Sequence, residues 1–476
     1  MQVRRLPTGE EKEVLSIGLA CSECFSGNNL YRLLKPGFDY EMKVMEELMN
    51  GNPSSPLSIH TSSGVPDALG PFLDALERHL PWKDSSDLDW CVSLQLEGAS
   101  AVWAGIDMLL QTRILETGDI GRKKVAVGTT SYHGPPSTSF GGKSPLWTKH
   151  WQLKYPTPVA GEPFDEEELV ARFEAFLEEN GPDIGVILLE PQWGSSQAGF
   201  PWPKSLLKKY IAMSKERGIK VLCDEIMCGL GRHGNKTLFV SEAWDLDPDC
   251  VTFGKAIGAG VFPLSGAILK QGKNLLRANK CSVMQSHTYA GSSARALMAA
   301  TAVLNEIPEW LPSISKLGEE MRLIFSYITK VSNGLVACHG QGLMWGGLFT
   351  RSGQCKDPAF RKKVVDEFKK SCDAVGILPY HVPVGGFMVS PVIDIDVGTI
   401  YEIGERIETA IVMTMKAVGW EGPAELSTVE ETNTIQQLAD QLSGKDECLP
   451  ILHKTKSCTS CSCFVSSNVR TRFLNV

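Results

Sequence analysis

Two apolar runs that each end on a carboxylate are the feature that most limits how this chain can fold. Residues 184–190 are almost unbroken in their apolar character and end on Glu190, and residues 219–224 end on Asp224. Runs without polar alternation are typical of strands covered on both faces, as in a parallel sheet between layers of helices. The intervening residues 203–218 predict a helix, because a proline opens the segment, apolar residues follow at helical spacing and a glycine closes it. The pattern therefore indicates stacked strand–helix–strand units.

Further segments extend this alternation on both sides. Four more short runs predict strands, and one longer apolar segment predicts a helix. The strands are expected at residues 92–96, 124–129, 250–253 and 266–269, and the helix at residues 101–113.

The chain after about residue 310 predicts a smaller α+β domain. Residues 313–331 and 357–375 have the spacing of amphipathic helices, and residues 346–350 and 388–395 predict strands. We therefore expect four parts along the chain. They are an N-terminal segment (residues 1–60), a large domain (61–310), a small C-terminal domain (311–445) and a disordered tail (446–476).

Composition excludes several classes of protein. Of the 476 residues, 43% are hydrophobic and 21% are charged, which is typical of a soluble globular protein with a large core. The 47 basic and 55 acidic residues give a net charge of −8, so these totals predict no binding to nucleic acid. No run reaches the roughly 18 apolar residues of a membrane span, and the N-terminus lacks the apolar core of a signal peptide. We expect a cytoplasmic protein without membrane association.

The 14 cysteines do not predict a disulfide framework. Most stand singly in apolar stretches, as Cys223 and Cys250 do, and indicate reduced core residues. Cys458, Cys461 and Cys463 lie close together in the expected tail, but no fourth ligand is evident beyond a histidine upstream. We predict no metal site.

The residues with chemical meaning lie at strand ends. Asp224 ends one buried strand, and Lys255 follows the strand at residues 250–253, between Gly254 and Gly258. Open α/β sheets bind ligands at the carboxyl ends of their strands. A lysine among glycines can approach a flat cofactor closely, and desolvation lowers its pKa so that it can form an imine. An isolated Gly-Lys pair would indicate only a solvated surface residue.

The order and spacing of residues 222–260 resemble the class-III branch of the fold-type-I aminotransferases that use pyridoxal 5'-phosphate (PLP). The family pattern is Asp-Glu-Val, then Gly-x-Gly-Arg-x-Gly, then Pro-Asp, and then Gly-Lys followed by glycines. The residues that match are Asp224, Glu225, Gly229, Gly231, Arg232, Gly234, Pro248, Asp249, Gly254 and Lys255. The resemblance implies an α/β fold with a mixed, mostly parallel sheet in a large PLP-binding domain, and a smaller α+β C-terminal domain.

The same resemblance implies the roles of two catalytic residues. Lys255 would carry PLP as a Schiff base, and Asp224 would pair with the pyridine nitrogen. A carboxylate there keeps that nitrogen protonated, so the ring can accept the electrons released when the substrate Cα–H bond breaks. The amine of Lys255, once released, can carry the proton.

Two segments upstream complete the cofactor site by resemblance. Tyr132 and His133 match the family's Tyr-His-Gly, whose aromatic ring stacks on the pyridine ring. Gly98, Ala99 and Ser100 precede a predicted helix, so their backbone N–H groups can meet a phosphate. The family has a hydroxyl residue and a glutamate where this chain has Ala99 and Ser100.

Two further landmarks lie elsewhere in the chain. Thr288, in a His-Thr-x-x-Gly segment, matches a threonine that reaches the cofactor phosphate of the neighbouring subunit, which implies a homodimer with a shared active site. Glu190, followed by a proline, matches a landmark that we assign to the substrate side of the site.

Departures from the family pattern indicate the class of substrate. Ser195 and Met388 stand where glutamate-handling members have a glutamate and an arginine, although Arg232 is another candidate to bind a substrate carboxylate. A donor whose amine is distant from any carboxylate therefore fits better. We expect an enzyme that moves a primary amino group from an ω-amino acid or amine to a small 2-oxo acid, in ping-pong half-reactions.

Three alternatives remain open at the level of sequence. An aminomutase or a decarboxylase shares the fold, because cofactor motifs do not determine which Cα bond breaks. A nucleotide-binding oxidoreductase would use the glycines around Lys255, but their spacing is not that of the Gly-x-Gly-x-x-Gly motif. A PLP-fold protein without catalysis is the third, since the loop with Ala99 and Ser100 is altered.

Overall fold

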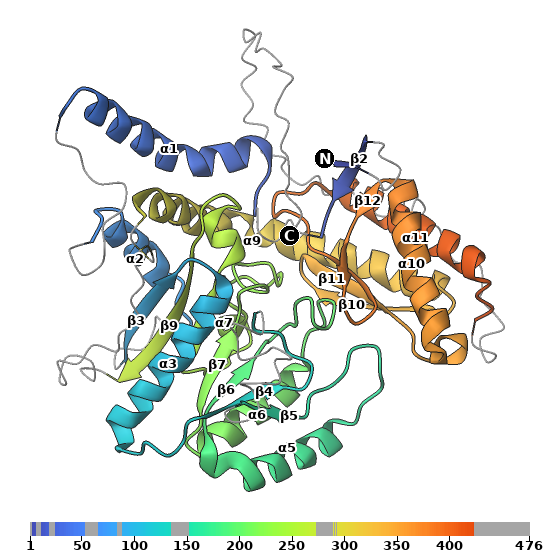
Figure 1. Ribbon diagram of the computed structural model, residues 1–476, viewed down its shortest axis with the longest axis horizontal. Coiled ribbons are helices and arrows are strands. Elements are labelled where there is room, and N and C mark those ends of the chain that lie inside the picture. The colour runs from blue at the N-terminus through green and yellow to red at the C-terminus, as the bar shows by residue number, and fades with distance from the viewer. Residues whose placement is uncertain are drawn as a thin grey trace.

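The computed structural model describes residues 2–5, 11–18, 24–52, 65–82, 88–134, 152–272, 289, 291 and 293–422. A seven-stranded sheet forms its centre, in the order β3-β9-β8-β7-β6-β4-β5 (Figure 1). Its strands are β3 (Leu88–Gln95), β4 (Lys124–Gly128), β5 (Gln152–Tyr155), β6 (Ile184–Leu189), β7 (Lys220–Asp224), β8 (Cys250–Phe253) and β9 (Ser265–Gly272). All the strands of this sheet that were expected from the sequence are present. The fold is α/β, as predicted.

The direction of the strands explains where polar residues gather. Strands β8, β7, β6, β4 and β5 pair in parallel, whereas β9 is antiparallel to both of its neighbours, β8 and β3. The sheet is therefore mixed but mostly parallel. The carboxyl ends of β3, β4, β6, β7 and β8 consequently lie on one edge.

Helices cover both faces of this sheet, which is why its strands are apolar throughout. Helix α3 (Gly98–Thr117) packs on one face, where its Val102 and Ile106 join Val125 and Leu222 in one cluster of buried side chains. Helices α5 (Glu166–Asn180) and α6 (Lys204–Glu216) belong to the cluster on the other face. The helix predicted between β6 and β7 is thus confirmed as α6.

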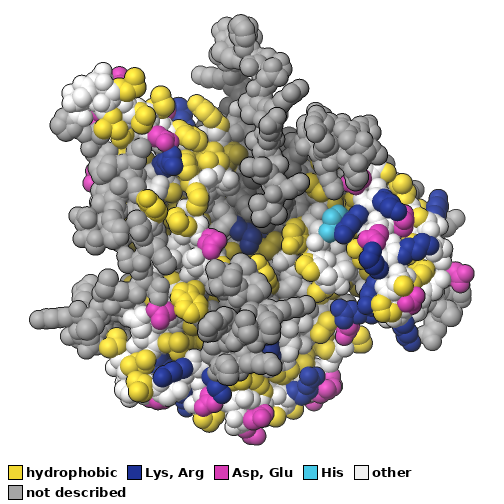
Figure 2. All heavy atoms as spheres, in the orientation of Figure 1, with side chains coloured by type: hydrophobic (Ala, Val, Ile, Leu, Met, Phe, Trp, Pro, Cys, Tyr) yellow, Lys and Arg dark blue, Asp and Glu magenta, His cyan; other side chains and the backbone are white. Residues whose placement is uncertain are grey.

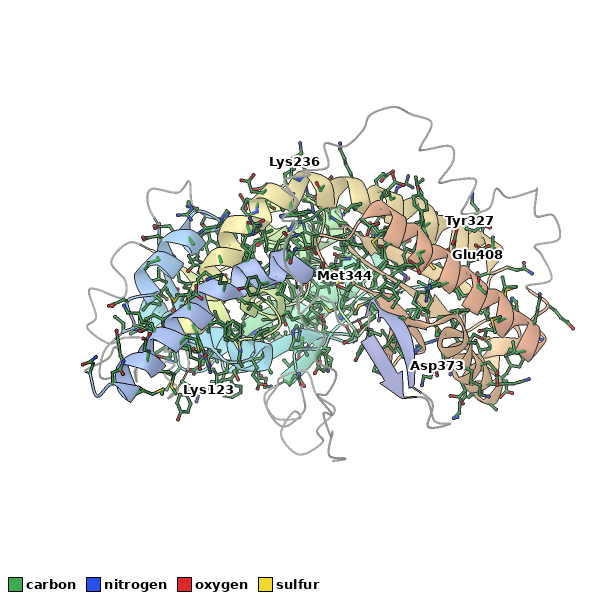
Figure 3. The ribbon with its side chains drawn as sticks, turned by 90° about the horizontal axis from the view of Figure 1, so that it is seen from above. Lys123, Lys236, Tyr327, Met344, Asp373 and Glu408 are labelled. Atoms are coloured by element: carbon green, nitrogen blue, oxygen red, sulfur yellow. The ribbon has the colours of Figure 1, made fainter. Side chains whose placement is uncertain are left out.

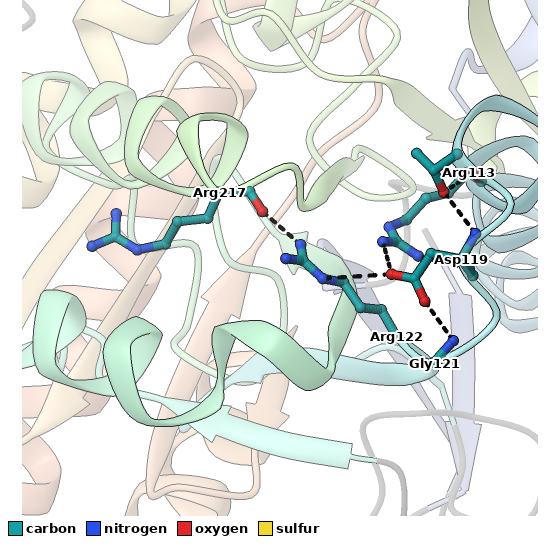
Figure 4. Close-up of polar contacts among 6 residues, drawn as sticks. Arg113, Asp119, Gly121, Arg122 and Arg217 are labelled. Carbon is teal, nitrogen blue, oxygen red and sulfur yellow. Dashed lines mark hydrogen bonds and ion pairs between the residues drawn. The ribbon is translucent and has the colours of Figure 1, made fainter.

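An ionic network at the edge of the sheet joins α3, β4 and α6 (Figure 4). Asp119 accepts hydrogen bonds from the Arg113 guanidinium at 2.6 Å and from the backbone N–H of Gly121 at 2.7 Å. Arg122 lies 4.0 Å from the same carboxylate and donates to the carbonyl oxygen of Arg217 at 2.6 Å. The loop that leads from α3 into β4 is thereby tied to the end of α6.

The second unit is built around a four-stranded antiparallel sheet in the order β10-β11-β14-β13. Helices α10 (Pro358–Val375) and α11 (Val397–Val418) lie at the right of Figure 1. The elements are α9 (Ala294–Val331), β10 (Val336–Gln341), β11 (Met344–Phe349), α10 (Pro358–Val375), β12 (Ile377–Leu378), β13 (Tyr380–Val382), β14 (Gly386–Val389) and α11 (Val397–Val418). The predicted helix at residues 357–375 and strand at residues 346–350 are confirmed.

Helix α9 is longer than the sequence predicts. We expected a helix over residues 313–331, but α9 begins at Ala294 and continues through Pro308 and Pro312. Each proline removes a backbone hydrogen bond, yet the helix buries apolar side chains along its whole length, and this packing outweighs the loss. No described helix has the length and apolar character to span a membrane.

Two tyrosine–carboxylate hydrogen bonds join α9 to α11. The Tyr327 hydroxyl donates to Glu408 at 2.8 Å, and the Tyr401 hydroxyl donates to Glu320 at 2.7 Å. Tyr327 and Glu408 are labelled where the two helices meet in Figure 3, which also labels Met344 near the middle of the molecule. In both bonds the residue of α11 comes 81 positions after its partner in α9. The two helices therefore lie side by side and run in the same direction.

The strand predicted at residues 388–395 is wrong beyond Val389. Strand β14 ends there, because Pro391 has no N–H to give to a neighbouring strand. The residues that follow bind the N-terminal part of the chain. The carboxylate of Asp394 accepts from the backbone N–H and hydroxyl of Ser26 and from the side chain of Asn29, at the start of α1 (Gly27–Met49).

The N-terminal segment contributes a strand to the second unit. Strands β1 (Gln2–Arg5) and β2 (Glu11–Ser16) pair with each other, and β2 also pairs in parallel with β12. Gly18 follows, and a Cβ atom there would lie only 2.0 Å from the backbone nitrogen of Tyr380. Only glycine can therefore bring the chain so close. The carbonyl of Ile17 then accepts the backbone N–H of Ser390 at 2.7 Å.

Candidate active site

The candidate site lies where neighbouring strands end. Glu190 directly follows β6, Asp224 is the last residue of β7, and Lys255 comes two residues after β8. These strands are adjacent and parallel in the sheet. Three ionisable residues that are far apart in the sequence therefore lie at one edge of the sheet, where open α/β sheets place ligands.

One side chain, Ile226, connects three segments of the site. A Cβ atom on Gly98, the first residue of α3, would lie 2.8 Å from Cγ2 of Ile226. A Cβ atom on Gly254 would lie 3.1 Å from Cδ1 of the same side chain. Both glycines therefore pack closely against Ile226, which follows the end of β7 and lies between the N-terminus of α3 and the residue before Lys255.

Asp224 is a buried and ionised carboxylate. Its Oδ2 lies 2.7 Å from Nδ1 of His133, and its Oδ1 accepts from the backbone N–H of Ile226 at 3.2 Å and the Thr252 hydroxyl at 3.1 Å. Burial raises the pKa of Asp224, but the hydrogen bond and charge of His133, the Ile226 N–H and the charge of Lys255 together lower it below its usual value. Asp224 can therefore stabilise a positive charge placed against it.

Lys255 adopts an unusual backbone conformation. Its φ is +46°, a left-handed value that is uncommon for a residue with a side chain. The strand that precedes it is buried, Ala256 and Ile257 after it are buried, and the lysine itself is only partly exposed. The surrounding fold holds the lysine in a strained conformation, as is often seen at functional sites.

Residues 131–134, which follow β4, form another part of the candidate site. His133 is 2% exposed and contacts Asp224, whereas the side chain of Tyr132 is 50% exposed. Partial burial raises the pKa of the Tyr132 phenol, and the charges of Tyr380, Glu97 and Glu190 raise it further, so these groups surround it. An aromatic ring thus lies next to the residue that contacts Asp224, with one part open to solvent.

Glu190 accepts hydrogen bonds only from backbone groups among the contacts described. Its Oε1 accepts the N–H of Tyr132 at 2.9 Å, and its Oε2 accepts the N–H of Gly194 at 3.4 Å. Burial raises its pKa to about 7, the charge of His133 lowers it, and the charge of Asp224 raises it. The carboxylate that we assigned to the substrate side is engaged in the wall of the site.

The start of α3 suits an anionic group. Glu97 precedes the helix in an extended conformation, and its side chain does not cap the helix. It instead accepts the Ser100 hydroxyl at 3.3 Å. Gly98, Ala99 and Ser100 form the first turn, whose N–H groups attract a phosphate.

The remaining predicted residues are buried in the core or lie outside the described residues. Met388 is 1% exposed in β14, within the main hydrophobic core. Arg232 is 2% exposed and donates to the carbonyl oxygens of Pro391 at 2.6 Å and Leu343 at 3.5 Å. Thr288 and the tail cysteines lie outside the described residues, and no described group of His, Cys, Asp and Glu side chains has the arrangement of a metal site.

Sequence reasoning missed several residues that support the site. Thr252 binds Asp224, Ile226 joins α3 to Lys255, and the indole N–H of Trp193 donates to Ser131 at 3.4 Å. Thr252 offered a weak signal, because it is the only polar residue in the run 250–253. The other two depend on contacts between distant segments.

Comparisons with known proteins show the family to which the chain belongs. A family profile described as aminotransferase class-III matches residues 97–393. The 5-aminovalerate aminotransferase of Pseudomonas putida is 33% identical over 202 residues, which are 40% of this chain and 45% of the relative. The chloroplastic gamma aminobutyrate transaminase 3 of Solanum lycopersicum is 27% identical over 299 residues, 57% of this chain and 55% of the relative. The chain thus spans about half the length of the curated relatives it matches.

Solved structures show the same fold. The pyridoxamine-phosphate-bound aminotransferase from Vibrio fluvialis superposes with a TM-score of 0.70 at 19% identity, over 87% of this chain and 90% of that one. The architecture is therefore that of fold-type-I PLP-dependent transferases. Because the family profile covers more than half of the sequence, the chain belongs to the class-III aminotransferase family.

The residues of the site fit the cofactor of this family, which is PLP. Asp224 offers a buried negative charge suited to a protonated pyridine nitrogen. Nε2 of His133 is buried and has no hydrogen-bond partner among the described residues, as expected beside a polar ligand. The half-exposed ring of Tyr132 and the first turn of α3 would meet the ring and the phosphate.

A buried carboxylate beside the site predicts how stability depends on pH. Glu225 accepts the N–H groups of Val240 and Ser241 and the Ser241 hydroxyl, but burial dominates and raises its pKa from 4.5 to about 7. Between these values the folded chain holds a proton that the unfolded chain has released. The contribution of Glu225 to stability is therefore complete below pH 4.5 and is lost as the pH rises through 7.

Replacing Glu225 by glutamine should remove this dependence. From pH 5 to 7 the free energy of unfolding of the unmodified chain should fall relative to that of Glu225→Gln, by up to about 1.4 kcal/mol per pH unit. Denaturant titrations at several pH values measure this free energy. Substitution of an exposed glutamate, Glu216→Gln, is the control and should leave the dependence of the free energy on pH unchanged. Parallel pH profiles for Glu225→Gln and the unmodified chain would refute the assignment.

Proposed function

We propose that this chain is an aminotransferase that uses PLP bound at Lys255 to move a primary amino group from an ω-amino acid or amine to a small 2-oxo acid. The observation that supports this most strongly is the placement of Lys255 and the ionised Asp224 at adjacent strand ends, where the charge of Lys255 helps to lower the pKa of Asp224. When bound, PLP supplies an electron sink for the bond that breaks at the substrate carbon.

The residues of the chain divide the remaining work. Asp224 would hold a proton on the pyridine nitrogen, and His133 keeps the Asp224 carboxylate in position. Lys255 would hold the cofactor through Nζ and, after release, move a proton at the substrate carbon. Tyr132 would exclude water from one face of the ring.

Two residues support a donor whose amine is distant from a carboxylate. Met388 is packed in the core and brings no charge, and the guanidinium of Arg232 is engaged by backbone carbonyl groups. A substrate carboxylate close to the reacting amine would need a buried cation, since an unpaired buried charge costs several kcal/mol. The names of the two curated relatives, 5-aminovalerate and gamma aminobutyrate aminotransferases, both refer to ω-amino acids.

A panel of half-reactions tests the proposed substrate class. The PLP form of the purified chain is mixed with simple amines, ω-amino acids, ornithine or glutamate, and loss of the cofactor absorbance is followed. We expect the amines and ω-amino acids to react fastest, and Lys255→Ala to show at least a hundredfold loss, which corresponds to ~2.7 kcal/mol. Glutamate as the best donor would overturn the substrate class, and a fully active Lys255→Ala would overturn the mechanism.

We also propose that the chain is a cytoplasmic homodimer with a shared active site. Helix α1, at the upper left of Figure 1, exposes apolar side chains that Figure 2 shows in yellow. They are Tyr31, Phe38, Met42, Met45, Leu48 and Met49. Most of these positions recur at helical spacing on one face, as in a helix that packs against another surface.

Mixing two inactive variants tests the shared site. If Thr288 acts in the partner's site, a heterodimer of Lys255→Ala and Thr288→Ala chains has one site with neither substitution. Activity should then return toward half of the unmodified level per heterodimer. The single Thr288→Ala variant must itself be strongly impaired. If no activity returns after demonstrated subunit exchange, each site is complete within one chain.

A further inference from the structure

The carboxylate of Glu190 joins two loops of the site. One oxygen accepts the backbone N–H of Tyr132, and the other accepts the backbone N–H of Gly194. Glu190 is 7% exposed and follows directly on β6, a strand buried along its whole length. A rigid element of the central sheet therefore holds the backbone on which Tyr132 stands.

A second contact supports the same loop. The indole N–H of Trp193 donates to the Ser131 hydroxyl at 3.4 Å. Trp193 is fully buried and stacks on Trp202 with ring centroids 4.7 Å apart. Two consecutive residues after β4 are thus held by residues that follow β6.

Packing alone holds only part of the Tyr132 ring. Half of the side chain is exposed, so burial alone does not determine where the ring lies. The position of the Tyr132 backbone therefore also affects where the ring lies, and Glu190 is the group that binds this backbone N–H. A change at Glu190 should therefore move the ring without touching the cofactor.

We propose that Glu190 is a positioning residue: by holding the backbone of Tyr132 it sets where the tyrosine ring lies against the cofactor ring. This inference rests on the proposed function, in which Tyr132 covers one face of that ring. Glu190 itself contacts neither substrate nor cofactor in this role. Glu190 instead supports the loop that places Tyr132 on one face of the cofactor ring.

The charge of Glu190 bears on this role. The ionisable groups whose charges act on it or are affected by it are His133, Asp224, Tyr132, Tyr155 and Cys228. An ionised carboxylate accepts both N–H groups, whereas protonation turns one oxygen into a donor. Because the pKa of Glu190 is raised to about 7, the grip on Tyr132 should weaken as the pH falls below neutrality.

The test measures binding of pyridoxamine 5'-phosphate, which forms no bond with Lys255. Glu190→Gln replaces one acceptor oxygen by an N–H donor, and we expect it to weaken binding by about tenfold and to reduce the circular dichroism of the bound ring. Glu225→Gln is the matched control, because Glu225 is also buried and directly follows the adjacent strand but binds residues 240 and 241 instead. It should retain affinity within about twofold.

The pH profile separates positioning from a general loss of structure. The ring dichroism of the unmodified chain and of Glu225→Gln should change with a midpoint near pH 7, and this step should be absent in Glu190→Gln. If Glu190→Gln does not fold, Glu190→Asp replaces it, since the shorter side chain cannot reach both N–H groups. Equal affinity and equal pH profiles for the Glu190 and Glu225 variants would overturn the proposal. An unmodified chain that does not bind pyridoxamine 5'-phosphate would instead overturn the proposed function.

Discussion

The site depends on one buried carboxylate, Asp224 at the end of β7, and on its 2.7 Å contact with His133. Asp224 would be costly to bury as a free charge, because a desolvated carboxylate without partners favours its protonated form. The 2.7 Å contact with His133 and the hydrogen bonds from Ile226 and Thr252 offset that cost and keep it ionised. A protein without these partners would hold a neutral acid at this point, and a pyridine nitrogen beside it would lose its counter-charge.

The surrounding fold explains why these partners meet. Parallel strands bring their carboxyl ends to one edge, so His133 and Asp224, which are 91 positions apart in the chain, become neighbours. Helix α3 starts at the same edge, because β3 runs in the same direction as β8. Two glycines then allow Ile226 to close the space between α3 and Lys255. The residues with chemical roles thus lie at strand ends and in the loops after them, and the sheet determines where these residues lie.

Local patterns were sufficient to predict six of the seven strands of the central sheet and the places of Lys255 and Asp224 at strand ends, because apolar runs and glycines lie within short segments, but they gave no prediction of β5. They were insufficient where packing between distant segments decides the outcome. Helix α9 continues through Pro308 and Pro312 because its apolar face is buried, and β2 joins the small unit through pairing with β12. For the same reason, the two backbone bonds of Glu190 gave no signal in the sequence.

The most direct test of the account is to trap the cofactor on the chain. Borohydride reduction of the PLP-loaded chain, followed by peptide mapping, locates the lysine that carried it, because reduction makes the link permanent. The account predicts a label on the peptide that contains Lys255, the lysine that follows β8 and whose charge helps to lower the pKa of Asp224. A label on any other lysine, or none under conditions in which PLP is bound, would contradict it.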